Sequence, residues 1–514
     1  MKEKIFNYGK GSLTINKAID IATGQISGII NQEAGKQIQK SSDAVNTIVK
    51  NKKTVYGVNT GFGSLCQTTI SEEDTKKLQY NILRSHSAGV GDIISNKTAK
   101  LMLILKVHAL SFGFSGARRK TLDRILWHIN NDIIPIVPSQ GSVGASGDLV
   151  PLSHLFLPLI GLGKVYYNGK IVKTKDMFEK ENISPLELGP KEGLALINGT
   201  QFMAAHAVIA ISRFKNILDN ADIIGAMSLE SLLGSTKPFD ERLHKLRPYK
   251  GTILVANRLR NLLKDSEMVE SHLNCERVQD PYSLRCIPQV HGASRNAYQH
   301  LKKIIEIEIN SVTDNPVIFN ENDSISGGNF HGQPIALPLD YATFAVSELG
   351  NISDRRTYLL LEGKNGLPTL LMKDTGVNSG FMIPQYTSAA LVSENKTLCY
   401  PASADSIPTS LGQEDHVSMG SISARKLNKV LDNLENILAV ELVCAAQAFD
   451  FRKPLKSSKI IEGCHDLVRD YIDHANKDRI FSKDIETANG IIQRGELVTI
   501  SEKISTEEDI ALNL

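Results

Sequence analysis

The strongest constraint on the fold of this chain is helical periodicity over three long segments. Apolar residues recur every three or four positions in residues 202–233, 340–362 and 425–451. Each segment is long enough for a helix of about 20 residues or more, and such helices pack lengthwise into bundles. Residues 1–200 instead mix shorter helical patterns with glycine-rich loops, and GKVYYNGKIV predicts a small hairpin. We therefore expect a mainly α chain with a helical, loop-rich N-terminal domain (1–200) and a long central and C-terminal helical bundle domain (201–514).

Composition excludes several classes of protein. The 514 residues carry 58 Lys and Arg against 56 Asp and Glu, without a block of like charge, so nucleic acid is not an expected partner. The six cysteines form no CxxC pair, which disfavours both a zinc site and a disulfide framework and predicts reduced thiols. The N-terminal residues lack the apolar core of a signal peptide, and no apolar run is long enough to span a membrane. The sequence predicts a cytoplasmic protein that makes no membrane contact.

One loop, QGSVGASGDLVPLSH (140–154), concentrates small residues between Gly141 and Gly147. A phosphate-binding loop would follow its last glycine with Lys and Ser or Thr, but Asp148 stands there. A serine hydrolase elbow would need a glycine two positions after Ser146, and Asp148 again occupies that place. A serine nucleophile is therefore disfavoured, and a plain connector between helices is the alternative that composition alone supports.

The triplet Ala145, Ser146 and Gly147 allows a third chemistry. The amide nitrogen of Gly147 can attack the Ala145 carbonyl, and loss of water followed by dehydration of Ser146 leaves a methylidene-imidazolone, an electrophile. Glycine favours such a cyclisation because it lacks the Cβ that would obstruct the attack. The loop resembles that of the histidine ammonia-lyase family, within the aromatic amino acid ammonia-lyases and aminomutases, whose members form this group autocatalytically from Ala-Ser-Gly.

Further segments resemble motifs of the same family, in the same order along the chain. Each taken alone is more often structural, but their order over most of the chain makes a chance resemblance improbable. The residues that the resemblance singles out are Tyr56 in YGVNTGFG, Ser85 and His86 in RSHSAGVG, Asn198 in LALINGTQ, Gln279, Tyr282 and Arg285 in VQDPYSLRCIPQ, Phe330 in GGNFHG, and Glu414 in QEDHVSM.

The resemblance implies roles for these residues in eliminating ammonia from an amino acid. Tyr56 is the expected base for the β-proton, but a phenol ordinarily ionises near pH 10, so positive charge and hydrogen-bond donors in the cleft, together with the electrophile, are expected to lower its pKa. Arg285 has a planar set of donors that suits the substrate carboxylate. Asn198 and Gln279 are neutral donors for the imidazolone oxygen or the carboxylate, and Tyr282 is expected to pass protons beside the electrophile. The sequence leaves open whether the substrate's amine or its ring attacks the electrophile.

Substrate choice depends on His86 and Glu414, while Phe330 is expected to cover the cleft. The Ser-His pair differs from the pairs of phenylalanine-specific and many tyrosine-specific relatives, and the glutamate is the form found in the histidine enzymes. Histidine is therefore the expected substrate, with trans-urocanate as product, in the first step of histidine degradation. Leu411 and Gly412 depart from the Ala-Asn pair expected before QEDH. Tyrosine or phenylalanine ammonia-lyases and aromatic aminomutases remain alternatives, as do a catalytically silent helical scaffold and a hydrolase that uses Ser146.

The resemblance also implies an architecture. The family shares the mainly α fold of the fumarase and aspartase superfamily and assembles as a homotetramer with active sites shared between subunits. We expect the electrophile at the N-terminal end of a helix that begins near Leu149, where the helix dipole favours negative charge. The implied partners are a small amino acid substrate and other copies of the chain, with no metal and no external cofactor.

Overall fold

The computed structural model describes residues 5–65, 67, 70–273 and 277–512. The chain divides into two compact units. Unit 1 comprises Met1–Ile209, Leu301–Asp340 and Pro401–Arg425, and unit 2 comprises Ala210–His300, Tyr341–Tyr400 and Lys426–Leu514. The sequence predicts a single boundary after residue 200. The first segment of unit 1 ends close to that position, but unit 1 also takes in two later segments, because residues distant in sequence pack together there.

The prediction of a mainly α fold is confirmed, and so are the three long helices. Helix α9 covers Gln201–Ser231, α15 covers Gln333–Leu361 and α17 covers Gly420–Asp450. A fourth long helix, α14, covers Ile287–Glu308. Since apolar residues surround α9 on nearly all sides, its burial is almost complete.

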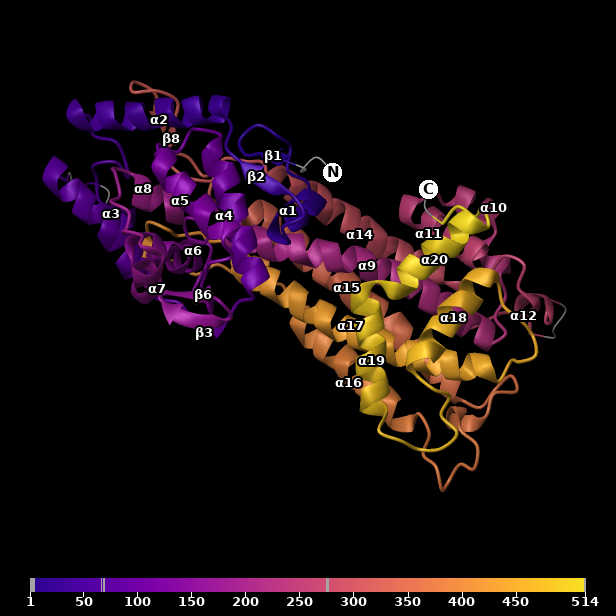
Figure 1. Cartoon of the computed structure of the whole chain (residues 1–514). Helices are drawn as coiled ribbons and strands as arrows, with labels where there is room; N and C mark the ends of the chain where they lie inside the picture. Colours follow the sequence, from indigo (N-terminus) through magenta and orange to yellow (C-terminus); the bar gives the residue numbers. More distant parts are fainter. Residues whose placement is uncertain (1–4, 66, 68–69, 274–276, 513–514) are drawn as a thin grey trace. The chain divides into compact units, whose positions relative to one another are not determined.

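Unit 1 combines short helices with small sheets. Helices α2, α4 and α5 lie side by side in the indigo and purple part of Figure 1. Helix α4 is buried on all its faces from Thr98 to Ser111. The predicted hairpin is confirmed, with Val165 opposite Val172. The helices of unit 1 outside the four long ones are α1 (Ile15–Ala22), α2 (Gln32–Lys50), α3 (Glu72–His86), α4 (Asn96–Ser111), α5 (Arg119–Asn130), α6 (Leu149–Phe156), α7 (Thr174–Glu181) and α8 (Glu192–Ile197).

The strands of unit 1 are short and pair locally, which leaves the helices to form the core. The strands are β1 (Ile5–Asn7), parallel to β2 (Ser27–Ile29); β3 (Val90–Ile93), antiparallel to β5 (Pro138–Gln140); β4 (Ile134–Pro135), β6 (Lys164–Tyr167) and β7 (Lys170–Lys173) in one antiparallel sheet; and β8 (Val317–Ile318), antiparallel to β9 (Ser324–Ile325). Short 3-10 turns cover Gly63–Leu65, Leu157–Ile160, Ala402–Ala404 and Ser410–Gly412.

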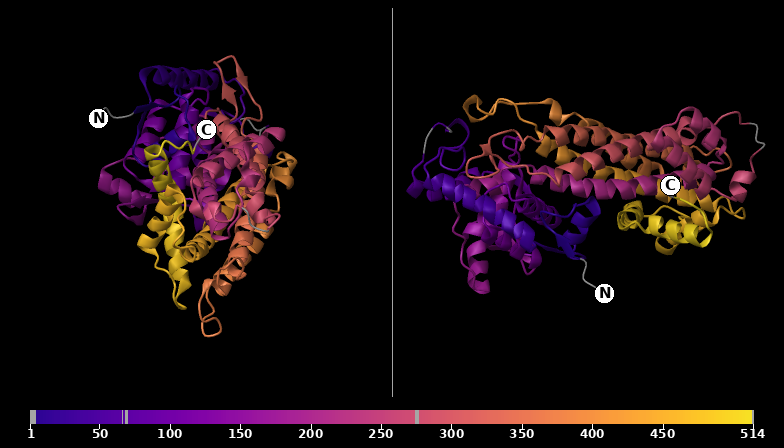
Figure 2. Two further views of the ribbon diagram at one scale, coloured as in Figure 1. Left: turned by 90° about the vertical axis from the view of Figure 1, so that its right-hand side faces the viewer. Right: turned by 90° about the horizontal axis from the view of Figure 1, so that it is seen from above.

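Unit 2 is built from helices whose mostly apolar core also contains buried ion pairs. Asp222 accepts from Arg258 and Arg295, and Arg356 pairs with Glu441. The C-terminal helices lie side by side, in yellow in Figure 2. The helices of unit 2 outside the long ones are α10 (Glu241–Leu246), α11 (Lys250–Leu262), α12 (Glu267–Glu270), α13 (Tyr282–Arg285), α16 (Met382–Leu398), α18 (Lys459–Tyr471), α19 (Phe481–Arg494) and α20 (Glu496–Glu507), with 3-10 turns at Lys237–Phe239 and Thr369–Leu371.

Three further expectations concern cysteines, metals and membranes. The four cysteines of the described part, Cys286, Cys399, Cys444 and Cys464, are free thiols. Within the same ranges, no cluster of three or more His, Cys, Asp or Glu side chains is arranged to hold a metal ion. None of the helices in the described part has both the length and the apolar character that a membrane crossing requires.

Candidate active site

The loop that carries Ala145, Ser146 and Gly147 folds back on itself directly before α6. Ser146 and Gly147 adopt positive φ angles of 50° and 80°. The amide of Gly147 donates to the carbonyl oxygen of Gly144 at 3.3 Å, which closes a tight turn. Because α6 begins at Leu149, the turn lies at the N-terminal end of a helix, as the sequence predicted.

Glycine is required at position 147 by the neighbouring backbone as well as by its φ angle. A Cβ atom there would lie 2.2 Å from the carbonyl oxygen of Gly199. That carbonyl accepts a hydrogen bond from the amide of Asp148 at 2.7 Å. The two segments 146–148 and 198–199 therefore lie against each other with no room for a side chain between them.

The carbonyl oxygen of Ser146 receives two hydrogen bonds from the second of these segments. The Nδ2 atom of Asn198 donates to it at 3.0 Å, and the amide of Gly199 donates at 3.2 Å. Asn198 is buried, so both donors are shielded from water. In an imidazolone formed from this triplet the same oxygen becomes the ring oxygen. The residues present thus fit the group, since two donors already hold the atom on which its negative charge would collect.

Asp148 fixes this arrangement from the other side. Its Oδ2 accepts from the amides of Phe202 and Met203, at 3.1 Å and 3.0 Å, in the first turn of α9. Its Oδ1 accepts from the Ser142 hydroxyl at 3.2 Å. Burial raises the pKa of Asp148 to about 7, although these donors oppose the shift. The carboxyl group is therefore a buried anchor between the loop and α9.

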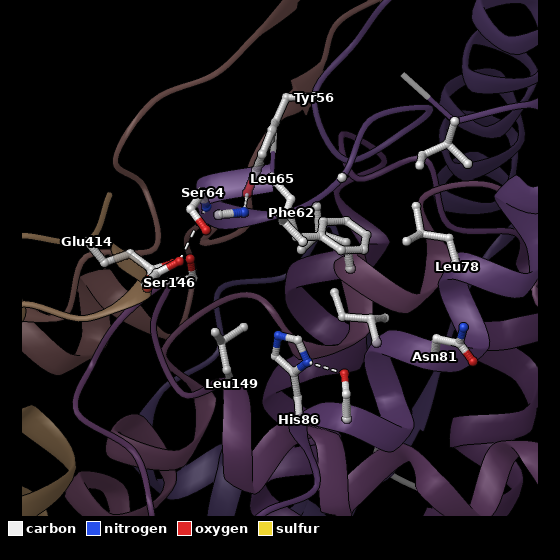
Figure 3. A pocket seen from close by; sticks show the side chains of 17 residues that line it. Tyr56, Phe62, Ser64, Leu65, Leu78, Asn81, His86, Ser146, Leu149 and Glu414 are labelled. Carbon is white, nitrogen blue, oxygen red and sulfur yellow. Dashed lines mark hydrogen bonds between the residues drawn. The ribbon is translucent and has the colours of Figure 1, made fainter. Parts of the chain in front are cut away.

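Two cavities of unit 1 adjoin the triplet, and Tyr56, Gly63, Ser146 and Glu414 line both of them. The first has a volume of about 660 Å³ (Figure 3). Its wall is mostly apolar, which suits the aromatic ring of a ligand. The wall contains Phe62, Leu65, Ile70, Leu78, Ile82, Leu149 and Leu194 together with Asn81, Ser85 and His86. The second, of about 470 Å³, is more polar and contains Thr54, Thr60, Asn198, Asn315, Ser326, Phe330 and Gln413.

Tyr56 approaches the cavities from a glycine-rich segment. Its hydroxyl oxygen accepts from the amide of Gly63 at 3.3 Å, in the 3-10 turn Gly63–Leu65. Figure 3 shows Tyr56 on the opposite side of the cavity from His86 and Leu149. No Lys or Arg is among the described residues that line either cavity. The positive charge expected to lower the pKa of Tyr56 is therefore not supplied by this lining.

Glu414 and His86 stand on different walls of the first cavity. Glu414 extends toward Ser146 in Figure 3, and its Oε2 accepts from the Thr409 hydroxyl at 3.1 Å. His86 is the last residue of α3, and its Nδ1 lies 3.0 Å from the Ser85 hydroxyl. Burial lowers the pKa of His86. The lowered pKa favours the neutral imidazole, whose two ring nitrogens can donate one hydrogen bond and accept another.

These motifs are shared with a known family of enzymes. Residues 13–470 match the family model described as aromatic amino acid lyase. The chain belongs to the aromatic amino acid lyase family. It is accordingly a carbon–nitrogen lyase of a family whose members use an autocatalytically formed methylidene-imidazolone.

Individual members of the family are similar over nearly the full length. A histidine ammonia-lyase of Natranaerobius thermophilus is 46% identical over 492 residues, which cover 93% of this chain and 96% of that protein. The crystal structure of histidine ammonia-lyase from Trypanosoma cruzi superposes with a TM-score of 0.90 at 40% identity, covering 97% of this chain and 95% of that one. A tyrosine aminomutase from Streptomyces globisporus superposes with a TM-score of 0.93 at 35% identity, covering 99% and 100%.

Three of the predicted site residues of this lyase do not line the cavities. Gln279, Tyr282 and Arg285 belong to unit 2. Gln279 is exposed and Tyr282 is 71% exposed, with the Arg285 guanidinium 4.5 Å from its ring centre. The buried Nε of Arg285 has no hydrogen-bond partner among the described residues. The remaining predicted site residues all line at least one cavity, apart from Ala145 and Gly147, which flank Ser146.

Leu411, which departs from the family pattern, is not among the residues that line the two cavities. Leu411 is 95% exposed, and Ser410, Leu411 and Gly412 have φ angles of 52°, 55° and 86°. The changed pair thus lies on a surface loop with left-handed backbone, while Ser410 beside it lines the first cavity.

Several wall residues of the lyase were not singled out from the sequence, although the quoted motifs contain some of them. Phe62 lies in YGVNTGFG, Leu194 in LALINGTQ, and Ser410, whose hydroxyl accepts from the amide of Ser64 at 3.3 Å, shortly before QEDH. Apolar and hydroxyl side chains carry no signal of their own. Only their position within motifs that carry chemistry would have identified them.

Proposed function

We propose that this lyase acts on L-histidine and releases ammonia without oxidation to give trans-urocanate. The observation that supports this best is Glu414, which lines both cavities and extends toward Ser146, where a carboxylate can bind an imidazole or an amine. The histidine ammonia-lyase of N. thermophilus, at 46% identity, supports the same substrate. The reaction breaks the Cα–N bond and one Cβ–H bond and forms a carbon–carbon double bond, so it needs no oxidant.

The electrophile of this proposal forms from Ala145, Ser146 and Gly147. The Gly147 nitrogen bonds to the Ala145 carbonyl carbon, and the Ala145 oxygen leaves as water with the amide protons of Ser146 and Gly147. The Ser146 hydroxyl then leaves as a second water with the Ser146 α-proton. The closed turn at Gly144–Gly147 supports this step, because it has already bent the backbone in the direction of the ring.

The imidazolone supplies an electrophilic carbon that captures either the amine or the ring of the substrate. In this proposal Tyr56 takes the β-proton, since Tyr56 and Ser146 line the same two cavities. Asn198 holds the oxygen that derives from Ser146. His86 and Glu414 bind the imidazole from opposite walls, and Phe330 closes the second cavity.

The proposed assembly is a homotetramer in which copies of the chain share each active site. Two observations support it. The cavity linings of unit 1 lack a cation for the substrate carboxylate within the described residues, and Arg285, Tyr282 and Gln279 belong to a partly exposed segment of unit 2. In this proposal that segment supplies Arg285 for the carboxylate, with Gln279 and Tyr282 beside it. A cytoplasmic location stays a prediction from the sequence.

A substrate comparison on the purified protein tests the proposal. Histidine, tyrosine and phenylalanine are supplied separately, and the unsaturated products are followed by their near-ultraviolet absorbance. We expect a much higher kcat/KM for histidine, an intact mass lower than the sequence mass by two waters, and a native mass of four chains. Turnover of tyrosine alone would reject the substrate, and an unchanged intact mass would reject the electrophile. An α- to β-amino acid conversion without release of ammonia would instead identify an aminomutase.

A further inference from the structure

A buried lysine lies behind the segment that holds the Ser146 carbonyl oxygen. Lys106 is in the second half of α4 and is 1% exposed. Its Nζ donates to the carbonyl oxygen of Asn198 at 2.5 Å and to the Oε1 of Gln201 at 3.3 Å. Both acceptors are neutral. Burying a cation against neutral acceptors has a large unfavourable free energy. An uncharged side chain would therefore fill a purely structural role with less loss of stability.

The contact with Asn198 is connected to Ser146 through one peptide group. The carbonyl oxygen of Asn198 and the amide of Gly199 belong to the same peptide unit, and this amide donates to the Ser146 oxygen at 3.2 Å. Lys106, the peptide unit and the Ser146 carbonyl thus form a continuous series of hydrogen bonds. A cation at the oxygen of a peptide group polarises it and makes its N–H a stronger donor.

We propose that Lys106 is a positioning residue that activates the electrophile formed from Ala145, Ser146 and Gly147. Its charge, transmitted through the Asn198–Gly199 peptide group, draws electrons toward the Ser146 oxygen and makes the methylidene carbon more reactive toward nucleophiles. It also fixes the Asn198 backbone, and with it the amide side chain that donates to the same oxygen. This inference rests on the proposed conversion of the triplet.

The charges around Lys106 decide when it is protonated. The pKa of Lys106 is lowered to about 7, with burial as the largest cause; Lys191 acts in the same direction, while Asp314 and Asp148 oppose the shift. Lys191 and Asp314 pair with each other at 2.9 Å, so their effects on Lys106 partly cancel. Because the pKa of this lysine is lowered, its positive charge is present below about pH 7 and is lost as the pH rises through that value.

The test measures the reactivity of the electrophile without using substrate. Cyanide is added to the protein, and its covalent addition is followed by intact mass and by the loss of near-ultraviolet absorbance. We expect Lys106→Met to lower the second-order rate constant roughly tenfold or more, in line with the loss of a charge-assisted hydrogen bond. Lys106→Arg should recover most of the rate. The control is Lys100→Met, which removes another shielded lysine of α4 that pairs with Asp132 and should leave the rate unchanged.

The outcomes separate this inference from the proposed function. If wild-type protein lacks the loss of two waters, the conversion itself is wrong. If Lys106→Met has lost two waters and reacts with cyanide at the wild-type rate, the role of Lys106 is wrong. Should Lys106→Met fail to fold, the test uses the ratio of the wild-type rate constant for cyanide addition to that of Lys106→Arg. The ionisation of cyanide does not affect this ratio, because it changes both rate constants by the same factor at each pH. We expect this ratio to fall as the pH rises through about 7, and a constant ratio would overturn the inference.

Discussion

Two segments that adjoin the same cavities are built in opposite ways. Around Ser146, the loop Gly144–Asp148 is held by hydrogen bonds from Asn198 and Gly199. It is also held by the Asp148 carboxylate, which accepts from a backbone amide in the first turn of α9. The loop Thr409–Glu414 is exposed at Leu411, Gly412 and Gln413; it is held by the pairing of Thr409 with Glu414 and by one hydrogen bond from the Ser64 amide to the Ser410 hydroxyl. The difference suggests a division of labour. Parts that must form and activate the electrophile are buried and held from several sides, whereas a part that faces the substrate's side chain lies on a more exposed loop.

The glycines of the two segments show the same contrast. Gly147 and Gly412 have similar φ angles, of 80° and 86°. A Cβ atom on Gly147 would meet the Gly199 carbonyl oxygen at 2.2 Å, whereas a Cβ atom on Gly412 would meet nothing within 4 Å. The same substitution therefore has the same backbone cost at the two positions but a different packing cost.

The largest effect is expected for Gly147→Ala, with Gly412→Ala as its matched control. Relief of the contact with Gly199 requires a backbone shift of about 1 Å or more, which is enough to lower kcat at least about 100-fold. The intact mass should no longer show the loss of two waters. Gly412→Ala should keep both the mass change and most of the activity. Circular dichroism checks that each variant is folded. An active Gly147→Ala variant would contradict the expected difference in packing between Gly147 and Gly412.

A smaller and more selective effect is expected for Glu414→Gln. The amide keeps the size of the side chain but removes its charge, so a charge-assisted hydrogen bond to histidine becomes a neutral one. We expect kcat/KM for histidine to fall about 10- to 100-fold, in line with the strength of such bonds. The loss of two waters should be unaffected, because Asn198 and Gly199 hold the Ser146 oxygen, whereas the Glu414 carboxylate accepts from Thr409. An equal fall in kcat/KM for histidine and for tyrosine would show that Glu414 does not discriminate between the side-chain rings of the two substrates.

The smallest effect is expected for Leu411→Asn. Leu411 has a φ angle of 55° and is 95% exposed, and asparagine tolerates the left-handed region better than leucine. The variant should be more stable by up to about 1 kcal/mol, measured by denaturant unfolding, with kcat/KM for histidine within about twofold of wild type. A large change in substrate preference would mean that the conformation of this loop, and not only Glu414, controls selectivity.

Much of the fold was predictable because helical periodicity is a local property. The runs at 202–233, 340–362 and 425–451 gave three long helices, and GKVYYNGKIV gave the hairpin of β6 and β7. The placing of the triplet before α6 followed from a local pattern too. The domain boundary at residue 200 stays a prediction; the compact unit 1 also includes residues 301–340 and 401–425, which join it through contacts that no local pattern reveals.

The candidate site was predictable only in part, for a related reason. Tyr56, His86, Asn198 and Glu414 have distinctive side chains within recognisable motifs, and the structure brings them to two adjoining cavities. Lys106 could be expected to be buried, since it stands within an apolar helix. The neighbouring residues in the sequence do not indicate what its ammonium group contacts.

The sequence by itself determined the chemistry available to this protein: a triplet able to cyclise, the polar residues able to serve it, and the helices that carry them. The tertiary structure alone decided which donors meet the Ser146 oxygen, why Gly147 admits no side chain, and that a buried lysine reaches the same oxygen through a peptide group. The physical reason is range. Periodicity and backbone chemistry depend on neighbours in sequence, whereas hydrogen bonds, burial and steric exclusion depend on residues that folding brings together from distant positions.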